Sequence, residues 1–364
     1  MLTEITPLIR KLADQQDLTA EEARRALNLV SAEDQEGLYF FALLLGIAAK
    51  GPTADELYGF CLSLSDQSVK LSPKVDPAEI TDISGTGGDR IKTFNIGTTA
   101  SLVIAASGIY VAKQSTGPFT GMTGSADIFN EIGASVPFSE GDPRKVEECL
   151  EKVGIVPYYY PSFSRESFVG RIAVRNRMRE SGLTFATPYH LVSWAFSPIE
   201  MKTRVYGVFS AKYLRALAQV FQKLGYERGL VVHGVDGIDE MSTIGPTKIC
   251  EFAGGDIEEY TITPEEVGLE RAKAEDIKAV SPERNVIDFL EILYGKERGP
   301  RRDIVLLNAA AALYVGDRAE DIREGVKMAE SLIDEGKASQ KVEDLVAFFE
   351  GQEKLERWKD TAGI

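Results

Sequence analysis

The chain is predicted to be an α/β protein with a small all-helical domain and a larger α/β domain, whose mainly parallel central sheet is flanked by helices. Up to about residue 72 the apolar residues recur at helical spacing. After that point short apolar runs alternate with glycine-rich turns and helices, which is typical of parallel βαβ units. The expected larger domain comprises residues 73–162 and 186–345, followed by a helical tail at 346–364.

The first 72 residues are expected to fold as about four helices. Thr19 and Glu22 have the spacing of a capping box, which marks one helix start. The run 39–49 is too apolar for a surface helix. Its excess apolar surface predicts packing on another domain or on a second copy of the chain. Helices at about 163–185 are expected to pack on this N-terminal domain.

The larger domain is expected to place its ligands where parallel strands end, at the carboxyl edge of the sheet. The expected strands are 80–84, 109–112, 204–209, 229–233 and 256–262. The expected helices are one starting near Thr98, one at 214–224, and a final group at 286–293, 304–314 and 321–335.

Composition limits the class of protein. The 364 residues include 41 Lys and Arg against 56 Asp and Glu, a formal net charge of −15, with 44% hydrophobic and 27% charged residues. This is typical of a soluble globular protein. The negative charge disfavours binding to nucleic acid, which requires Lys and Arg to displace counterions. A phosphorylated ligand would therefore have to be bound by local features.

Other residue types exclude further classes. Cys61, Cys149 and Cys250 are widely spaced, so a disulfide framework or a structural zinc site is not expected. His190 and His233 are too isolated for a catalytic triad and are interpreted as packed, hydrogen-bonded side chains. No targeting segment and no apolar run of about 20 residues is present, which predicts a cytoplasmic protein without membrane contact.

A glycine-rich segment at 82–100 is the first candidate site. Gly85, Gly87 and Gly88 lie between a short strand and a helix start. Glycines allow backbone N–H groups to approach an anion, and the helix N-terminus adds partial positive charge. The segment matches neither the Walker loop nor the dinucleotide fingerprint. A phosphate loop is favoured over a plain glycine-rich turn.

Two further segments follow expected strands. Lys113 begins a segment of hydroxyls and glycines up to Asp127, interpreted as a second phosphate loop, with a surface loop as the alternative. Asp239 and Glu240 come after an apolar strand. Paired carboxylates together with substrate phosphates suit Mg²⁺, so this pair is the predicted metal site, with a solvated turn as the alternative.

These segments resemble the anthranilate phosphoribosyltransferase family. The resemblance covers most of the chain and is carried by the motifs GTGGD at 85–89, TFNI at 93–96, GSAD at 124–127, GIDE at 237–240 and NAAAALY at 308–314. It implies a homodimer formed through the helical domain. It also implies Mg²⁺-dependent transfer of the phosphoribosyl group from 5-phosphoribosyl diphosphate (PRPP) to the amine of anthranilate, with release of pyrophosphate, in tryptophan synthesis.

The resemblance also implies residue roles. The residues expected to bind the diphosphate and ribose phosphate are Gly85, Thr86, Gly87, Gly88, Asp89, Thr93, Asn95, Thr98, Lys113 and Ser125. Those expected to contact the acceptor are Gly85, Gln114, Thr116, Arg175 and Arg179. Asp239 and Glu240 would bind the metal. No side chain is assigned as a catalytic acid or base, because the expected catalysis stabilises charge on the leaving group.

Departures from the family pattern concern mainly the acceptor. The family places His-Gly-Asn-Arg after its lysine, where this chain has Gln114 to Gly117. Gly97 replaces a serine whose hydroxyl would help to bind metal. Two alternatives therefore stay open: a phosphoribosyltransferase with another nitrogen acceptor, and a nucleoside phosphorylase-like enzyme, which needs no Asp-Glu metal pair. The net charge disfavours a third, a non-catalytic relative that binds nucleic acid.

Overall fold

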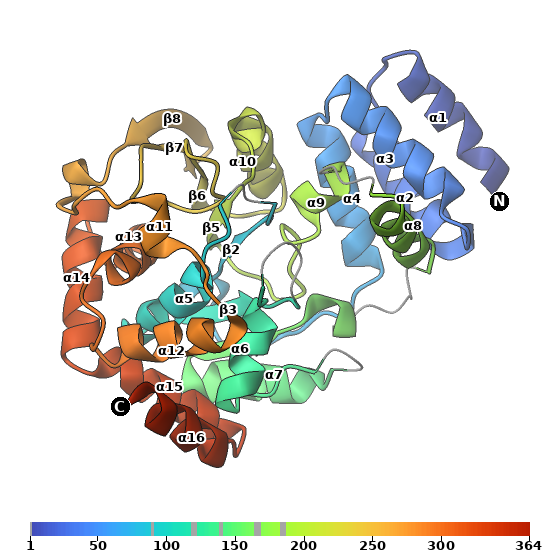
Figure 1. Cartoon of the computed structure of the whole chain (residues 1–364). Coiled ribbons are helices and arrows are strands. Elements are labelled where there is room, and N and C mark those ends of the chain that lie inside the picture. The colour runs from blue at the N-terminus through green and yellow to red at the C-terminus, as the bar shows by residue number, and fades with distance from the viewer. Residues whose placement is uncertain (1, 89–90, 118–121, 138–140, 164–168, 183–186) are drawn as a thin grey trace. The chain divides into compact units, whose positions relative to one another are not determined.

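The structure is a computed structural model, and it describes residues 2–88, 91–117, 122–137, 141–163, 169–182 and 187–364 (Figure 1). The chain forms two compact units. The smaller comprises Met1–Lys70, Phe163–Pro198 and Gln219–Leu224. The larger comprises Leu71–Ser162, Ile199–Ala218 and Gly225–Ile364.

The smaller unit is all-helical. Its helices are α1 (Thr6–Ala13), α2 (Ala20–Glu33), α3 (Leu38–Lys50), α4 (Ala54–Asp66), α8 (Val169–Glu180) and α9 (Pro188–Val192). The predicted capping box is confirmed, because the Glu22 amide donates to Thr19 Oγ1 at 3.2 Å and the Thr19 amide donates to Glu22 Oε2 at 2.8 Å. Helix α8 packs against α2 and α3. The helical N-terminal domain that the sequence predicts is thus present.

The larger unit contains two sheets. One is parallel, in the order β1 (Ile80–Thr81), β3 (Tyr110–Gln114) and β4 (Ile155–Tyr158). The other has the order β2 (Ile83–Gly85), β5 (Thr203–Gly207), β6 (Arg228–Gly234), β7 (Thr247–Ala253) and β8 (Asp256–Ile262). Its first three strands are parallel, and β6, β7 and β8 pair antiparallel. The segment expected as one strand at 80–84 therefore leaves one sheet and enters the other at Asp82.

The β7–β8 hairpin differs from the expected parallel pattern. Strand β7 was not predicted, and β8 pairs with it across the two-residue turn Gly254-Gly255. Both turn glycines have positive φ, 58° and 96°, which is the backbone that tight hairpins with the right strand twist require. The Gly-Gly dipeptide followed by an alternating strand was the sequence signal for this hairpin.

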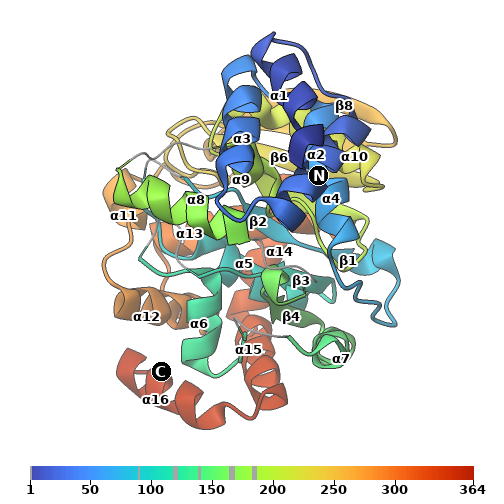
Figure 2. The same ribbon diagram turned by 90° about the vertical axis from the view of Figure 1, so that its right-hand side faces the viewer.

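Helices cover the sheets of the larger unit (Figure 2). They are α5 (Ile96–Ala106), α6 (Ser125–Ile132), α7 (Pro143–Val153), α11 (Ala274–Ile277), α12 (Pro282–Leu293), α13 (Pro300–Val315), α14 (Ile322–Asp334), α15 (Lys337–Phe348) and α16 (Gln352–Ala362). Helix α10 (Leu214–Lys223) is divided between the two units. Short 3-10 helices occur at Leu2–Glu4, Pro77–Glu79, Tyr160–Phe163, Ala211–Tyr213 and Glu265–Val267.

The core of the larger unit is built around α5 and α13, which pack against each other. Ala309, Ala310, Ala311 and Ala312 are all 0% exposed, and most of α5 is buried as well. Helices that are apolar on every side belong in a core, and these two fix the positions of the loops at their N-terminal ends. No helix among the described residues is both long and apolar enough to cross a membrane.

Candidate active site

The first glycine-rich loop begins where β2 ends. A Cβ on Gly85 would lie 2.2 Å from Asp239 Oδ2, so only glycine allows this carboxylate to approach the strand. Gly87 and Gly88 have φ of 67° and 92°, a backbone that favours glycine. The loop is therefore shaped around Asp239, although the two segments are more than 150 residues apart in sequence.

The predicted metal pair lies against amides of this loop and of α5. Asp239 is only 5% exposed, and its Oδ2 accepts a hydrogen bond from the Gly87 amide at 2.6 Å. Glu240 Oε1 accepts one from the Gly97 amide at 3.0 Å, in the first turn of α5. Both amides thus donate to a carboxyl oxygen of the pair. The alternative of a solvated turn is wrong for Asp239.

Helix α13 fixes the carboxylate pair in place. Asn308 Nδ2 donates to the Met241 carbonyl at 2.9 Å, and Asn308 Oδ1 accepts from the Met241 amide at 3.0 Å. This two-point contact holds the residue that directly follows Glu240. Sequence reasoning gave Asn308 no role, although a lone polar residue in a buried apolar helix was a signal of a specific hydrogen bond.

The electrostatics of the pair favour a bound cation. Burial and the neighbouring charge of Asp239 raise the pKa of Glu240 to about 8, against the opposing effects of the Gly97 amide and Lys113. Two adjacent carboxylates in a buried site do not both ionise easily without a counter-charge. A divalent cation supplies that charge, and carboxylates with phosphate oxygens are the ligands that Mg²⁺ prefers.

Lys113 lies beneath the first loop. It is 4% exposed, and its Nζ donates to the Ile83 carbonyl at 2.6 Å and to the Gln114 carbonyl at 3.4 Å. Burial lowers its pKa, while the carboxylates of Asp82, Glu240 and Asp239 oppose this shift. The structure thus shows Nζ on the main chain at the base of the loop. A contact with the ribose phosphate stays a prediction.

A buried ion pair that sequence reasoning missed adjoins Lys113. Arg204 on β5 is 0% exposed, and its Nη2 contacts Asp82 Oδ2 and donates to Ser84 Oγ, both at 2.8 Å. It therefore connects β5 with the segment where the chain passes between the two sheets. The only signal in the sequence was the charged residue Asp82 within the segment expected as a strand. Its partner could not be identified from the sequence, because Arg204 is 122 residues away.

The second loop is closed at its two ends. The Thr116 amide donates to Ser125 Oγ at 2.9 Å, and the Thr116 carbonyl accepts from the Ala126 amide at 2.9 Å. A Cβ on Gly124 would lie 2.1 Å from the Thr116 carbonyl oxygen. The structure thus brings together two predicted site residues, Thr116 and Ser125, at the start of α6. Gln114, at the end of β3, is 2% exposed.

The remaining predicted residues of the first loop lie on either side of the start of α5. This helix begins at Ile96, two residues before the expected start, with Asn95 as its N-cap. Thr98 is 4% exposed in its first turn, and Thr86 Oγ1 accepts from the Phe209 amide at 3.0 Å. Thr93 forms an isolated bridge with Lys278. Asp89 lies outside the described residues.

Two predicted acceptor residues belong to the other unit. Arg175 and Arg179 lie on α8 of the smaller unit, and Arg175 is exposed. Both histidines are hydrogen-bonded as predicted: His190 Nδ1 accepts from the Thr187 amide at 3.0 Å, and His233 Nδ1 contacts the Val208 carbonyl at 2.7 Å. Burial lowers the pKa of His190 to about 4.

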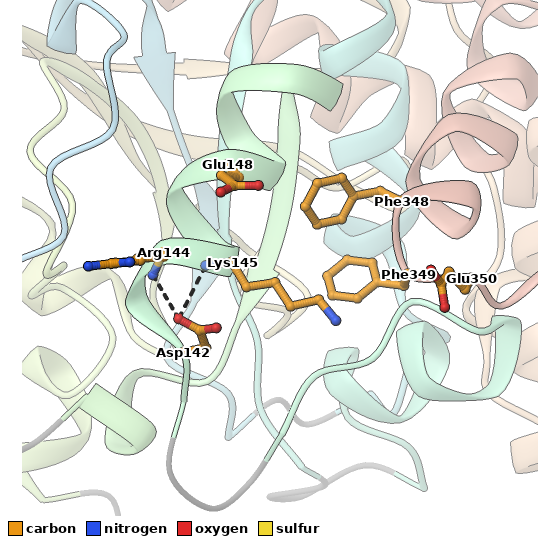
Figure 3. A pocket seen from close by; sticks show the side chains of 7 residues that line it. All are labelled: Asp142, Arg144, Lys145, Glu148, Phe348, Phe349 and Glu350. Atoms are coloured by element: carbon orange, nitrogen blue, oxygen red, sulfur yellow. Dashed lines mark hydrogen bonds between the residues drawn. The ribbon is translucent and has the colours of Figure 1, made fainter.

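Two further features were found outside the glycine loops. Among the described residues no group of three or more His, Cys, Asp or Glu side chains could hold a metal ion. A surface hollow of about 500 Å³ lies between α7 and the end of α15, with Lys145, Phe348 and Phe349 in its wall (Figure 3). None of its lining residues is a predicted site residue.

Comparisons with known proteins agree with the observed fold. The model of the glycosyl transferase family a/b domain matches residues 77–339, and that of the family's helical bundle domain matches residues 6–68. The anthranilate phosphoribosyltransferase of Methanococcoides burtonii is 39% identical over 94% of this chain and 94% of its own length.

Solved structures give the same result. The anthranilate phosphoribosyltransferase of Thermus thermophilus has a TM-score of 0.82 at 31% identity, covering 94% of this chain and 99% of its own. The Saccharomyces cerevisiae enzyme in complex with PRPP and Mg has a TM-score of 0.82 at 20% identity, covering 96% and 98%, and at that identity it supports the fold alone. With both domains matched over most of its length, the chain belongs to the anthranilate phosphoribosyltransferase family of glycosyltransferases.

Proposed function

We propose that this enzyme transfers the 5-phosphoribosyl group from PRPP to the amine of anthranilate in a Mg²⁺-dependent reaction that releases pyrophosphate, a step of tryptophan synthesis. The observation that carries the proposal is the placement of Asp239 and Glu240 on amides of the glycine loop and of α5. This arrangement supports the proposal, because carboxylates suit Mg²⁺ and backbone N–H groups at a glycine loop and a helix start suit phosphate.

The diphosphate is expected to lie along the first loop. Gly85, Gly87 and Gly88 leave the backbone open to a close approach, and the N-terminus of α5 adds partial positive charge. The Gly87 and Gly97 amides donate to carboxyl oxygens of Asp239 and Glu240, and N–H groups that point at oxygen acceptors support this expectation. The diphosphate would take the place of a carboxylate at these donors.

Mg²⁺ fits the donor set of the pair. Mg²⁺ takes one or two protein carboxylates and completes its octahedron with phosphate oxygens and water, so a cluster of three protein ligands is not required. When bound, the ion neutralises charge that develops on the leaving pyrophosphate. The raised pKa of Glu240 means that its proton must be released as the ion binds.

The chemistry needs positioning more than proton transfer. As the C1–O bond to pyrophosphate breaks, C1 of the ribose gains positive charge, and the amine nitrogen forms the new C1–N bond and loses a proton to solvent. The glycine loop and the Asp-Glu pair are proposed to hold the leaving group in a preorganised field, and Lys113 to contact the ribose phosphate. No side chain in this group has to act as a base, since the amine is already nucleophilic.

The acceptor is proposed to meet Gln114 and Thr116 of the larger unit. Both lie between Lys113 and the start of α6, next to the region expected for the ribose. Arg175 or Arg179 is proposed to bind the carboxylate of anthranilate, because guanidinium groups bind carboxylates through paired hydrogen bonds. The family's histidine and asparagine are absent from this segment, which makes it the place where another acceptor would be selected.

A homodimer through the smaller unit is proposed as well. Leu38 and Leu45 on α3 are 67% and 45% exposed, which is unusual for large apolar side chains on one helix. Light scattering on the purified protein should give twice the chain mass. A Leu45→Glu variant should shift the mass toward that of one chain, and a monomeric wild type would contradict the proposal.

The reaction is tested by incubating the enzyme with PRPP, Mg²⁺ and anthranilate while following anthranilate fluorescence. We expect the fluorescence to fall with equimolar release of pyrophosphate, and chelation of the metal should stop both. Turnover with another amine only would keep the class of enzyme and exclude anthranilate. Metal-independent phosphorolysis of a nucleoside would contradict the proposal and favour a phosphorylase.

A further inference from the structure

A chain of three side chains connects the two glycine loops to α12. Asn95 occupies the N-cap position of α5 without a capping hydrogen bond from its side chain, Thr123 precedes α6 in the second loop, and Asn285 lies in the first turn of α12. All three belong to the larger unit, where α12 packs beside α5 and α6 (Figure 1). Neither Thr123 nor Asn285 has a role in the function proposed above.

The side-chain hydrogen bonds lead from Asn285 through Thr123 to Asn95. Asn285 Nδ2 donates to Thr123 Oγ1 at 2.7 Å, and the Thr123 hydroxyl donates to Asn95 Oδ1 at 2.7 Å. Asn95 Nδ2 then donates to the Thr123 carbonyl at 3.3 Å. Because Asn285 occupies a lone pair of the hydroxyl oxygen, the single hydroxyl proton is directed to Asn95. The Asn95 amide is therefore held at two points in one orientation.

The burial of Asn285 is energetically unfavourable and is not explained by packing alone. It is 1% exposed, and its Oδ1 has no hydrogen-bond partner in the part of the chain that the structure describes. An unsatisfied buried oxygen is unfavourable, and an apolar side chain of similar size would avoid it. The contribution of Asn285 must therefore come from its donor group, which contacts the second loop.

The segment before α12 is attached to the first loop independently. The Ala279 amide donates to the Lys92 carbonyl at 2.8 Å, and Lys278 pairs with Thr93. Arg301 donates to the Lys278 carbonyl at 2.7 Å, and its guanidinium lies 5.3 Å from the Phe94 ring centroid. Residues 278–285 thus contact the first loop at Lys92 and Thr93 and the second loop at Thr123.

We propose that Asn285 and Thr123 are positioning residues for the phosphoribosyl diphosphate site, which they serve by fixing Asn95 and by holding the second loop against the first. This inference rests on the proposed function, because it gives Asn95 a role in binding PRPP. An Asn side chain has two N–H donors and only one is used within this chain of hydrogen bonds, so the other is available to a phosphate or hydroxyl of PRPP.

Thr123 offers a matched pair of variants for the test. Thr123→Val removes the hydroxyl at nearly constant volume, and Thr123→Ser keeps it. Calorimetric titration of the full-length protein with PRPP and Mg²⁺ should show affinity reduced about tenfold in the valine variant, the size expected for one buried hydrogen bond, and within about twofold of wild type in the serine variant. Equal affinity of the valine variant and wild type would overturn the inference, as would equal weakening in both variants.

A double-mutant cycle separates positioning from general destabilisation. Asn285→Leu should weaken PRPP binding as Thr123→Val does, and the two together should cost little more than one, because they interrupt the same chain. Asn130→Ala is the control. Asn130 accepts from the Val136 amide at 2.7 Å at the far end of α6, so its loss should lower the melting temperature without changing PRPP affinity.

The outcomes for the two proposals are distinguishable. A wild-type protein that binds PRPP but does not convert anthranilate contradicts the proposed acceptor only, and the binding comparison still decides the role of Thr123. A wild-type protein that does not bind PRPP at all contradicts both proposals. Fully additive losses in the double variant would contradict the positioning chain alone.

Discussion

The first glycine loop and the proposed acceptor segment differ in how completely the protein builds them. At the loop, the carboxyl groups of Asp239 and Glu240, which follow β6, accept hydrogen bonds from the amides of Gly87 and Gly97. Helix α13 binds the main chain of the residue that follows this pair. The acceptor residues are divided between the end of β3 in the larger unit and α8 in the smaller one. In the proposed function, PRPP is bound by residues of one unit, whereas the residues proposed for the acceptor come from separate segments of the chain.

Removing the carboxylate pair should produce the largest effect. The double variant Asp239→Asn, Glu240→Gln keeps acceptors for the Gly87 and Gly97 amides but loses the negative charge that binds Mg²⁺. We expect kcat/KM to fall by about 1,000-fold or more, since the leaving group loses its metal. Steady-state assays with PRPP and anthranilate measure this.

Glu251→Gln is the matched control for this double variant. Glu251 on β7 accepts hydrogen bonds from Tyr260 at 2.8 Å and Tyr314 at 3.0 Å and is not part of the proposed site. The control should retain near wild-type kcat/KM. Similar losses of kcat/KM in the control and the double variant would mean that Asp239 and Glu240 affect activity only through protein stability. The contrast between the glycine loop and the acceptor segment would then be wrong.

Gly85→Ala should have the next largest effect. Its Cβ would lie 2.2 Å from Asp239 Oδ2, so the carboxylate or the loop must move by an ångström or more. A misplacement of about that size costs on the order of 100-fold in kcat/KM. Gly245→Ala is the control and should be nearly neutral. A Cβ on Gly245 would make only an ordinary contact, at 3.7 Å from Asp236 Oδ2. Equal effects of the two substitutions would contradict the role of Gly85.

Substitutions at the proposed acceptor residues should reduce activity less and should affect anthranilate but not PRPP. Arg175→Ala should raise the KM for anthranilate about tenfold, the loss expected for a charge-assisted hydrogen bond, and leave the KM for PRPP unchanged. Arg177→Ala on the same helix is the control, because Arg177 is already paired with Glu36 at 2.7 Å. A change in the KM for PRPP, or no change at all, would exclude Arg175 and leave Arg179 as the candidate.

The smallest expected effect is a pH dependence of stability. The pKa of Glu240 is raised to about 8 in the folded protein, from an ordinary value of 4.5. The folded state therefore binds this proton more tightly than the unfolded state, and the stabilisation is lost as the pH rises between about 4.5 and about 8. Without divalent ions, the melting temperature of Glu240→Gln should rise relative to that of wild type by several degrees or more as the pH increases from about 4.5 to about 8. If the melting temperatures of the two proteins changed with pH by the same amount, Glu240 would have an ordinary pKa and this prediction would be wrong.

Local sequence patterns predicted the parts of the site that depend on the main chain. The glycines of the first loop and their place between a strand and a helix led to the correct placement of the loop at the end of β2, because backbone geometry limits those positions to glycine. The helical N-terminal domain, the parallel strands and the capping box at Thr19 follow from equally local rules.

Contacts between distant residues could not be predicted in this way. Asn308 lies 67 residues from Met241, and Arg204 lies 122 residues from Asp82, so no short window contains either pair. The division of 80–84 between two sheets was missed for the same reason, since the choice of sheet depends on β3 and β5. The residues proposed for the acceptor are also distant from one another in sequence.

A crystal structure with PRPP and Mn²⁺ in place of Mg²⁺ tests the account most directly, since the anomalous signal of Mn²⁺ locates the ion. We expect the ion about 2.0–2.2 Å from oxygens of Asp239 or Glu240 and of the diphosphate, with the diphosphate along Gly85 to Gly88. An ion bound elsewhere, with the Asp239–Gly87 and Glu240–Gly97 hydrogen bonds unchanged, would contradict the account.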